Sequence, residues 1–158
     1  MPKALVSYYS RTGNTKKMAA RIAGVLESQG LETDLKTVAG TSPADLLGYD
    51  CIVLGSPTYY GTMAWELKKL LDESVKFHGK LRGKVGGAFT SSANIGGGNE
   101  TTVLAILEAL LIHGMVVCGD SEGDHYGPVS IEKPDARAEK VCVRYGKRVA
   151  VLTKKLHG

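Results

Sequence analysis

The segment Ser10–Thr15, SRTGNT, places three hydroxyl side chains, an amide and a glycine between an apolar run and a helical pattern. Together with the backbone N–H groups of a helix start, these groups can hold a phosphate. A helix cap needs only one such side chain, so we expect a phosphate cradle rather than a simple cap. Arg11 is expected either to point to solvent or to meet the phosphate. The candidate residues are Ser10, Arg11, Thr12, Gly13, Asn14 and Thr15.

The spacing within this segment limits the kind of phosphate. The GxxxxGK[ST] pattern of a triphosphate loop is absent, and so is the GxGxxG turn of a dinucleotide site. A monophosphate held mainly by neutral donors is therefore the anion that we predict.

Two later segments carry groups suited to a flat ring. In SPTYYG, Ser56–Gly61, adjacent tyrosines can stack on a ring while the glycine permits close backbone approach. In TSSANIGGGNETT, Thr90–Thr102, three glycines allow backbone groups to lie along the polar edge of a planar ligand. The alternative for the tyrosines is that they only cover a helix. The alternative for the glycine-rich segment is a flexible connection. The candidate residues are Pro57, Thr58, Tyr59, Tyr60, Gly61, Ser91, Ser92, Ala93, Asn94, Gly96 and Gly97.

The elements that must position these segments alternate between strand and helix. Apolar or alternating runs predict five strands, at Lys3–Tyr9, Leu31–Val38, Cys51–Pro57, Lys84–Ser92 and Met115–Gly119. Helical spacing predicts helices between Thr15 and Gly30, over Thr41–Leu46, Met63–Ser74 and Glu100–Gly114, and at the C-terminus. The last helix is expected to bury Cys142, Tyr145, Val149, Leu152 and Leu156.

This alternation predicts an α/β fold with a parallel sheet covered by helices on both faces. Ligands of such sheets bind at the carboxyl ends of the strands, so the loops after the strands should form one site. The loop after the fifth strand, Asp120–Ser130, adds His125 and Tyr126. A monophosphate cradle, a stacking wall and a polar edge together fit a phosphorylated planar heterocycle, and FMN is the cofactor that we expect.

Length and composition fit a single domain over residues 1–158. No apolar run is long enough to span a bilayer, and the N-terminus does not resemble a signal peptide. The three separated cysteines, Cys51, Cys118 and Cys142, argue for a reducing cytoplasm and against a disulfide framework or a metal site. The net charge is +4, and the basic residues gather in the last helix. We expect a solvated basic face there, because no nucleic-acid-reading motif accompanies it.

Four motifs in order, YYSRTGNTKKMA, GSPTYYGTM, FTSSANIGGGNETT and HGMVV, resemble the flavodoxin superfamily over nearly the whole chain. Within it, they are most similar to the WrbA branch of NAD(P)H:quinone oxidoreductases. The resemblance implies a flavodoxin-like, doubly wound, five-stranded sheet of order 2-1-3-4-5. It implies the FMN phosphate on Ser10–Thr15, the isoalloxazine against Pro57–Gly61 and the pyrimidine edge at Ser91–Gly97.

The resemblance also implies a flavin-contacting histidine at His113 and a role for Tyr126 in the loop after the fifth strand. For His113 the alternative is a histidine placed at a helix C-terminus by the macrodipole. Because the flavin would do the chemistry, we expect no catalytic residue other than this candidate.

Two functions stay open, an FMN electron carrier between protein partners and an NAD(P)H-dependent FMN reductase of quinones. Short loops before the third strand and after the fifth favour the carrier, since WrbA-type enzymes have insertions there. The glycine-rich fourth loop and the motif match favour the reductase. The fourth loop also lacks the aromatic residue with which plain flavodoxins cover the second face of the flavin. We favour the carrier; a homodimer is compatible with either.

Overall fold

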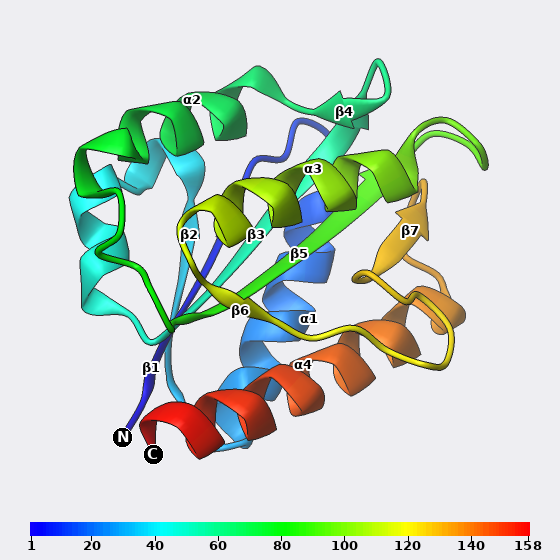
Figure 1. Ribbon diagram of the computed structural model, residues 1–158. Coiled ribbons are helices and arrows are strands. Elements are labelled where there is room, and N and C mark those ends of the chain that lie inside the picture. The colour runs from blue at the N-terminus through cyan, green and yellow to red at the C-terminus, as the bar shows by residue number, and fades with distance from the viewer.

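The computed structural model describes residues 1–158 and contains a central parallel sheet (Figure 1). Its main strands lie in the order β2-β1-β3-β5-β6. Their bounds are β1 Lys3–Tyr8, β2 Glu32–Thr37, β3 Cys51–Tyr59, β5 Val85–Ser92 and β6 Val116–Val117. This is the order expected for a doubly wound sheet, and the predicted fold class is confirmed.

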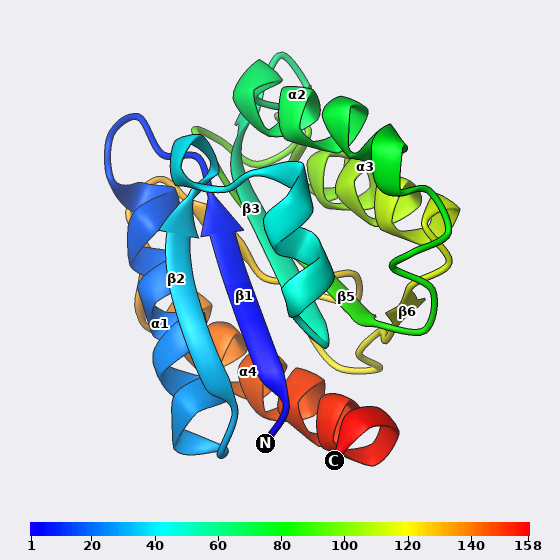
Figure 2. The ribbon, with the colours of Figure 1, turned by 90° about the vertical axis from the view of Figure 1, so that its left-hand side faces the viewer.

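Helices cover both faces of the sheet (Figures 1 and 2). Successive residues of each strand point to opposite faces of the sheet. Val6 and Val53 pack in one core with α1 and α4, whereas Leu5 packs in another with α2 and α3. The helices are α1 Asn14–Ser28, α2 Trp65–Glu73, α3 Asn99–Ile112 and α4 Ala136–His157, with short 3₁₀ helices η1 Val38–Gly40, η2 Pro43–Gly48 and η3 Ser74–Phe77. Burial on both faces explains why the central strands are continuously apolar.

The fifth strand differs from the prediction. The expected strand Met115–Gly119 is reduced to β6, and a short strand that was read as loop, β7 Val129–Ile131, pairs with β5 further along. Between them the chain leaves the sheet, and its acidic side chains bond to α4. Asp120 accepts from Arg144 and Arg148 at 2.6 Å each, and Asp124 accepts from Arg137 at 2.9 Å.

The predicted basic face of α4 is therefore partly neutralised by this acidic segment. One predicted burial is wrong: Leu156 is 49% exposed at the end of α4. Leu35 is 42% exposed because β2 is an edge strand with little cover. Cys51 and Cys142 lie in the core as expected, and all three cysteines are free thiols. No helix is both long and apolar enough to cross a membrane.

One further strand lies at the carboxyl edge of the sheet, where we expect the cofactor. β4, Thr62–Met63, pairs antiparallel with the end of β3, with Tyr59 opposite Thr62. The connection is a two-residue turn, Tyr60–Gly61, in which both residues have positive φ, 45° and 82°. This is the pattern of a type I′ hairpin turn, in which an aromatic residue at the first position is strained.

Candidate functional site

Three loops meet at the carboxyl edge of the sheet and line a cavity of about 510 Å³. They lie at the carboxyl ends of β1, β3 and β5, as the sequence predicted, and include the last residues of β3 and β5. The lining residues are Ser10, Arg11, Thr12, Asn14, Thr15, Pro57, Thr58, Tyr59, Ser91, Ser92, Ala93 and Glu132. Seven of these residues carry a hydroxyl group, and the set includes one basic and one acidic side chain, Arg11 and Glu132.

The phosphate-cradle segment leaves the start of α1 uncapped. Gly13 occupies the N-cap position in a left-handed conformation, φ 101°, and no side chain accepts from the first turn. The Gly13 N–H itself donates to Ser10 Oγ at 3.1 Å, which folds the loop back on itself. The alternative of a simple side-chain cap is therefore wrong. Backbone N–H groups at an uncapped helix start, beside hydroxyls, are suited to an anion.

One buried hydrogen bond joins the first loop to β5. Thr15 Oγ1 and Ser91 Oγ lie 2.8 Å apart, and both residues are almost completely buried. The two hydroxyls therefore satisfy each other and fix the start of α1 against the third cofactor loop. Ser10, Thr12 and Asn14 keep their polar groups at the cavity wall.

The second loop presents Tyr59, not Tyr60, to the cavity. Tyr59 lines the wall and meets the Tyr9 ring edge-on, with ring centroids 6.3 Å apart. Tyr60 lies in the two-residue turn at the tip of the hairpin, and its side chain is fully exposed. The expected stacking residue of this loop is thus Tyr59.

The second and third loops are in direct contact. A Cβ atom added to Gly98 would lie 2.4 Å from Gly61 Cα, so only glycine allows the two backbones to approach this closely. Thr101 Oγ1 donates to the Gly61 carbonyl at 2.7 Å and holds the hairpin against α3. Asn94, Gly96 and Gly97 continue this loop beyond the lining residues.

Two predicted residues that do not belong to the three loops, His113 and Tyr126, also lie outside the cavity. His113 is buried at the end of α3, with Nε2 2.7 Å from Ser74 Oγ. The adjoining Gly114 carbonyl accepts from Gly83, just before β5, so His113 lies near the amino end of the sheet. α3 begins at the cofactor edge and ends at the opposite one, which is why the two are separated. Burial lowers the pKa of His113 and favours the neutral ring.

Tyr126 lines a separate groove of about 320 Å³ together with Ile95 and Arg137. The structure does not bring it to the cavity wall.

One lining residue, Glu132, was not among the candidates predicted from the sequence. It follows β7 with φ 54°, and its N–H donates to the Ser92 carbonyl at 2.7 Å. This pairing carries the residue to the cavity edge. No local pattern marks Glu132, because its place depends on the β5–β7 pairing.

A comparison with protein families identifies the family to which this chain belongs. The family model described as a flavodoxin domain matches residues 5–95, more than half of the chain, including the cavity-lining residues of all three loops. The chain belongs to the flavodoxin domain family.

Relatives of this flavodoxin domain carry two kinds of name. A protein named flavodoxin from Aquifex aeolicus is 40% identical over 95% of this chain and 86% of its own length. A protein named NAD(P)H dehydrogenase (quinone) from Archaeoglobus fulgidus is 33% identical over 99% of this chain and all of its own.

Solved structures agree with the assignment. The WrbA-like flavodoxin of Agrobacterium tumefaciens superposes with a TM-score of 0.84 at 28% identity, covering 99% of both chains. An archaeal flavodoxin superposes with a TM-score of 0.81 at 29% identity, covering 96% of this chain and 99% of its own. The chain is a flavodoxin-like redox flavoprotein.

Proposed function

We propose that the flavin is FMN and that it binds in the cavity formed by the three loops. The observation that supports this best is the uncapped start of α1 beside Ser10, Thr12 and Asn14, which offers neutral donors to one phosphate. Arg11 adds one positive charge at the same wall. Bound FMN would supply the redox chemistry.

The remaining lining residues fit the rest of such a cofactor. Pro57, Thr58 and Tyr59 offer a wall for a flat ring, and the Ser91–Ala93 backbone offers polar groups. Thr58 Oγ1 lies 3.0 Å from Thr90 Oγ1, which ties the ends of β3 and β5 together. The protein's part is therefore to bind and orient the flavin. Asn94, Gly96, Gly97, Tyr60 and Gly61 belong to the same loops but do not line the cavity.

We further propose that this flavodoxin carries electrons between protein partners in the cytoplasm. The relative named flavodoxin aligns over 159 positions that cover 95% of this chain, so only short insertions fall within the aligned region. The quinone dehydrogenase relative needs 190 positions to align with 158 residues, so it has segments that this chain lacks.

A quinone reductase remains the second candidate. Several relatives bear that name, at up to 41% identity. The loop after β5 carries no aromatic side chain, and its only large residue, Ile95, is 84% exposed. A flavin left open on that side would be accessible to flat donors and acceptors.

An anaerobic titration separates the two. FMN-loaded protein is mixed with NADH or NADPH, with and without benzoquinone, while the visible flavin absorbance is followed. A carrier should keep its absorbance with either nicotinamide and lose it with dithionite. Rapid loss with a nicotinamide, restored by quinone, would identify a reductase. Failure to bind FMN at all would contradict both candidates.

A further inference from the structure

The two helices on one face of the sheet carry most of the positive charge of this protein. α1 and α4 pack side by side there (Figures 1 and 2) and contain ten basic residues against two acidic ones, a net charge of +8. The whole chain carries +4, so the remainder carries −4. A groove of about 430 Å³ lies between the two helices, and Glu139 and Val143 line it together with four basic residues, Arg21, Lys140, Arg144 and Lys147.

The arginines and the lysines of these helices differ in their bonds within the protein. All four arginines form ion pairs with carboxylates of the same chain: Arg21, Arg137, Arg144 and Arg148. All six lysines are exposed and have no carboxylate partner. We call them the lysine face: Lys16, Lys17, Lys140, Lys147, Lys154 and Lys155. Their charges are therefore free to attract an anionic partner.

The lysine face extends to the proposed flavin site. Asn14, Lys17 and Arg21 are three and four residues apart, so they lie along one side of α1. Asn14 lines the cofactor cavity and Arg21 lines the groove, which places Lys17 between the two. A partner docked at this corner of the molecule contacts both the lysine face and the rim of the cavity.

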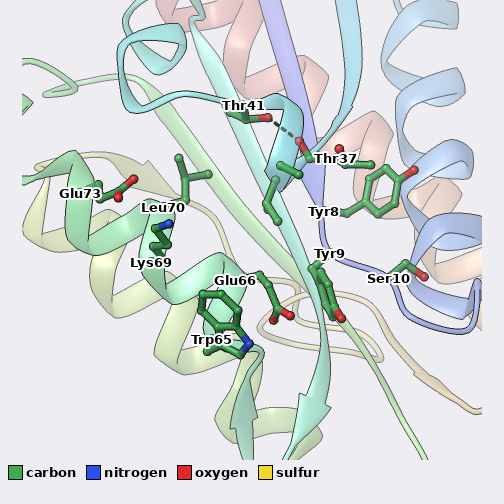
Figure 3. A pocket seen from close by; sticks show the side chains of 12 residues that line it. Tyr8, Tyr9, Ser10, Thr37, Thr41, Trp65, Glu66, Lys69, Leu70 and Glu73 are labelled. Carbon is green, nitrogen blue, oxygen red and sulfur yellow. Dashed lines mark hydrogen bonds between the residues drawn. The ribbon is translucent and has the colours of Figure 1, made fainter.

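The helices on the opposite face have the reverse charge. α2 and α3 contain five acidic residues and two basic ones. A second cavity, of about 470 Å³, lies on that side between α2 and the end of β1, and Tyr9 and Glu66 line it. Figure 3 shows Lys69 between Glu66 and Glu73 in this cavity. The charge of an approaching protein therefore selects the face on which it docks.

Side-chain types narrow the class of anionic partner. Proteins that hold single-stranded nucleic acids combine basic residues with aromatic residues on which the bases stack. The exposed aromatic residues Tyr60, Trp65 and Tyr126 stand near the sheet's carboxyl edge, whereas α1 and α4 expose none. Lysines without aromatic neighbours fit the carboxylates of a protein surface better.

We propose that the redox partner of this flavodoxin is a protein with an acidic surface, which docks across the lysine face and the cavity rim. This inference rests on the proposed carrier function. One electron leaves the reduced flavin and reduces an oxidised one-electron metal centre of the docked partner. Attraction between the lysines and the partner's carboxylates accelerates the encounter and orients it.

The test measures electron transfer by stopped flow from FMN-loaded protein that has been reduced with dithionite. The acceptors are plastocyanin, whose Cu(II) lies near an acidic surface patch, and cytochrome c, whose Fe(III) haem is ringed by lysines. Each metal accepts one electron. The rate constant with plastocyanin should fall at least about tenfold between about 0.01 M and 0.5 M salt, because salt screens exposed charges. The rate constant with cytochrome c should not fall.

The double variant Lys17→Glu/Lys140→Glu reverses two charges of the lysine face. It should slow transfer to plastocyanin at least about tenfold at low salt, within the range that electrostatic steering contributes. At high salt it should approach the parent rate, which a damaged flavin site would not do. Lys69→Glu/Lys76→Glu is the matched control, since it changes the net charge equally at exposed lysines outside the lysine face. It should slow transfer much less.

The outcomes separate this inference from the carrier function. Transfer to neither acceptor would refute the carrier function and this inference with it. Transfer to both, with a plastocyanin rate independent of salt or with equal effects of the two double variants, would refute the acidic partner alone. Salt-sensitive binding of a DNA duplex to the lysine face, without the predicted effects on transfer, would assign that face to nucleic acid instead.

Discussion

Thr12 is the exposed hydroxyl residue at the centre of the phosphate-cradle segment, and it lines the cavity. Thr12→Glu would place a carboxylate where the FMN phosphate is proposed to lie. Like charges forced together cost several kcal/mol, so we expect the variant to lose FMN during gel filtration. Ala20→Glu adds the same charge on the exposed side of α1 and should retain the flavin. Retention of FMN by Thr12→Glu would refute the phosphate assignment.

Tyr59 and Tyr60 are adjacent but lie differently, and this gives a matched pair. Tyr59→Ala should weaken FMN binding by about 1–3 kcal/mol, the range measured for stacking of bases on aromatic residues. Tyr60→Ala should change the affinity less, because the Tyr60 ring is fully exposed at the hairpin tip. Fluorescence titration of apoprotein with FMN measures both. The opposite ranking would mean that Tyr60 is the residue that stacks.

At the scale of elements, the cofactor edge depends on close contact between the β3–β4 hairpin and the start of α3. Gly98→Ala would place a Cβ atom 2.4 Å from Gly61 Cα at a residue with φ 105°. We expect a loss of unfolding free energy of about 1–3 kcal/mol, together with weaker FMN binding. Urea unfolding and FMN titration measure the two effects.

Gly96→Ala is the matched control for that prediction. Gly96 belongs to the same loop and also has positive φ, 73°, but nothing lies within 4 Å of an added Cβ. It should show only the backbone penalty of about 1 kcal/mol and nearly normal FMN affinity. Equal effects of the two variants would mean that the hairpin contact contributes nothing.

At the scale of the whole molecule, Asp120 joins the segment between β6 and β7 to α4. The Glu122 N–H and then Arg144 and Arg148 lower the pKa of this carboxyl group below its usual value. A lowered folded-state pKa stabilises the fold above the unfolded pKa, about 3.9, and this stabilisation disappears as the pH falls through the folded pKa. Asp120→Asn should therefore lower the Tm at neutral pH.

The Tm difference between Asp120→Asn and the parent should shrink as the pH falls below about 4 and disappear below the lowered folded-state pKa, where Asp120 is protonated in the folded protein as well. Thermal unfolding over a pH series measures this. Asp72→Asn, which removes an exposed ion pair with Lys68, should change the Tm little at any pH. A pH-independent difference for Asp120→Asn would show that its charge is not what stabilises the fold.

Patterns that span only a few residues were sufficient to predict much of the fold and of the site. The apolar strands before Ser10, Pro57 and Ser91 each end in polar or glycine-rich residues, and parallel strands end at one edge. The strands, the three cavity loops and most of the cavity wall could therefore be predicted from local sequence, whereas the strand order was implied by the resemblance to the flavodoxin superfamily. The physical reason is that side-chain periodicity and backbone capping act over a few residues.

Contacts between distant segments decided the rest. Glu132 reaches the cavity only because β7 pairs with β5, and His113 is carried away from it by the direction of α3. The turn at Tyr60 decides that Tyr59 faces the cavity. The second cavity joins Tyr9 to Glu66, which are far apart in sequence. Such juxtapositions arise from packing of whole elements, and no local period encodes them.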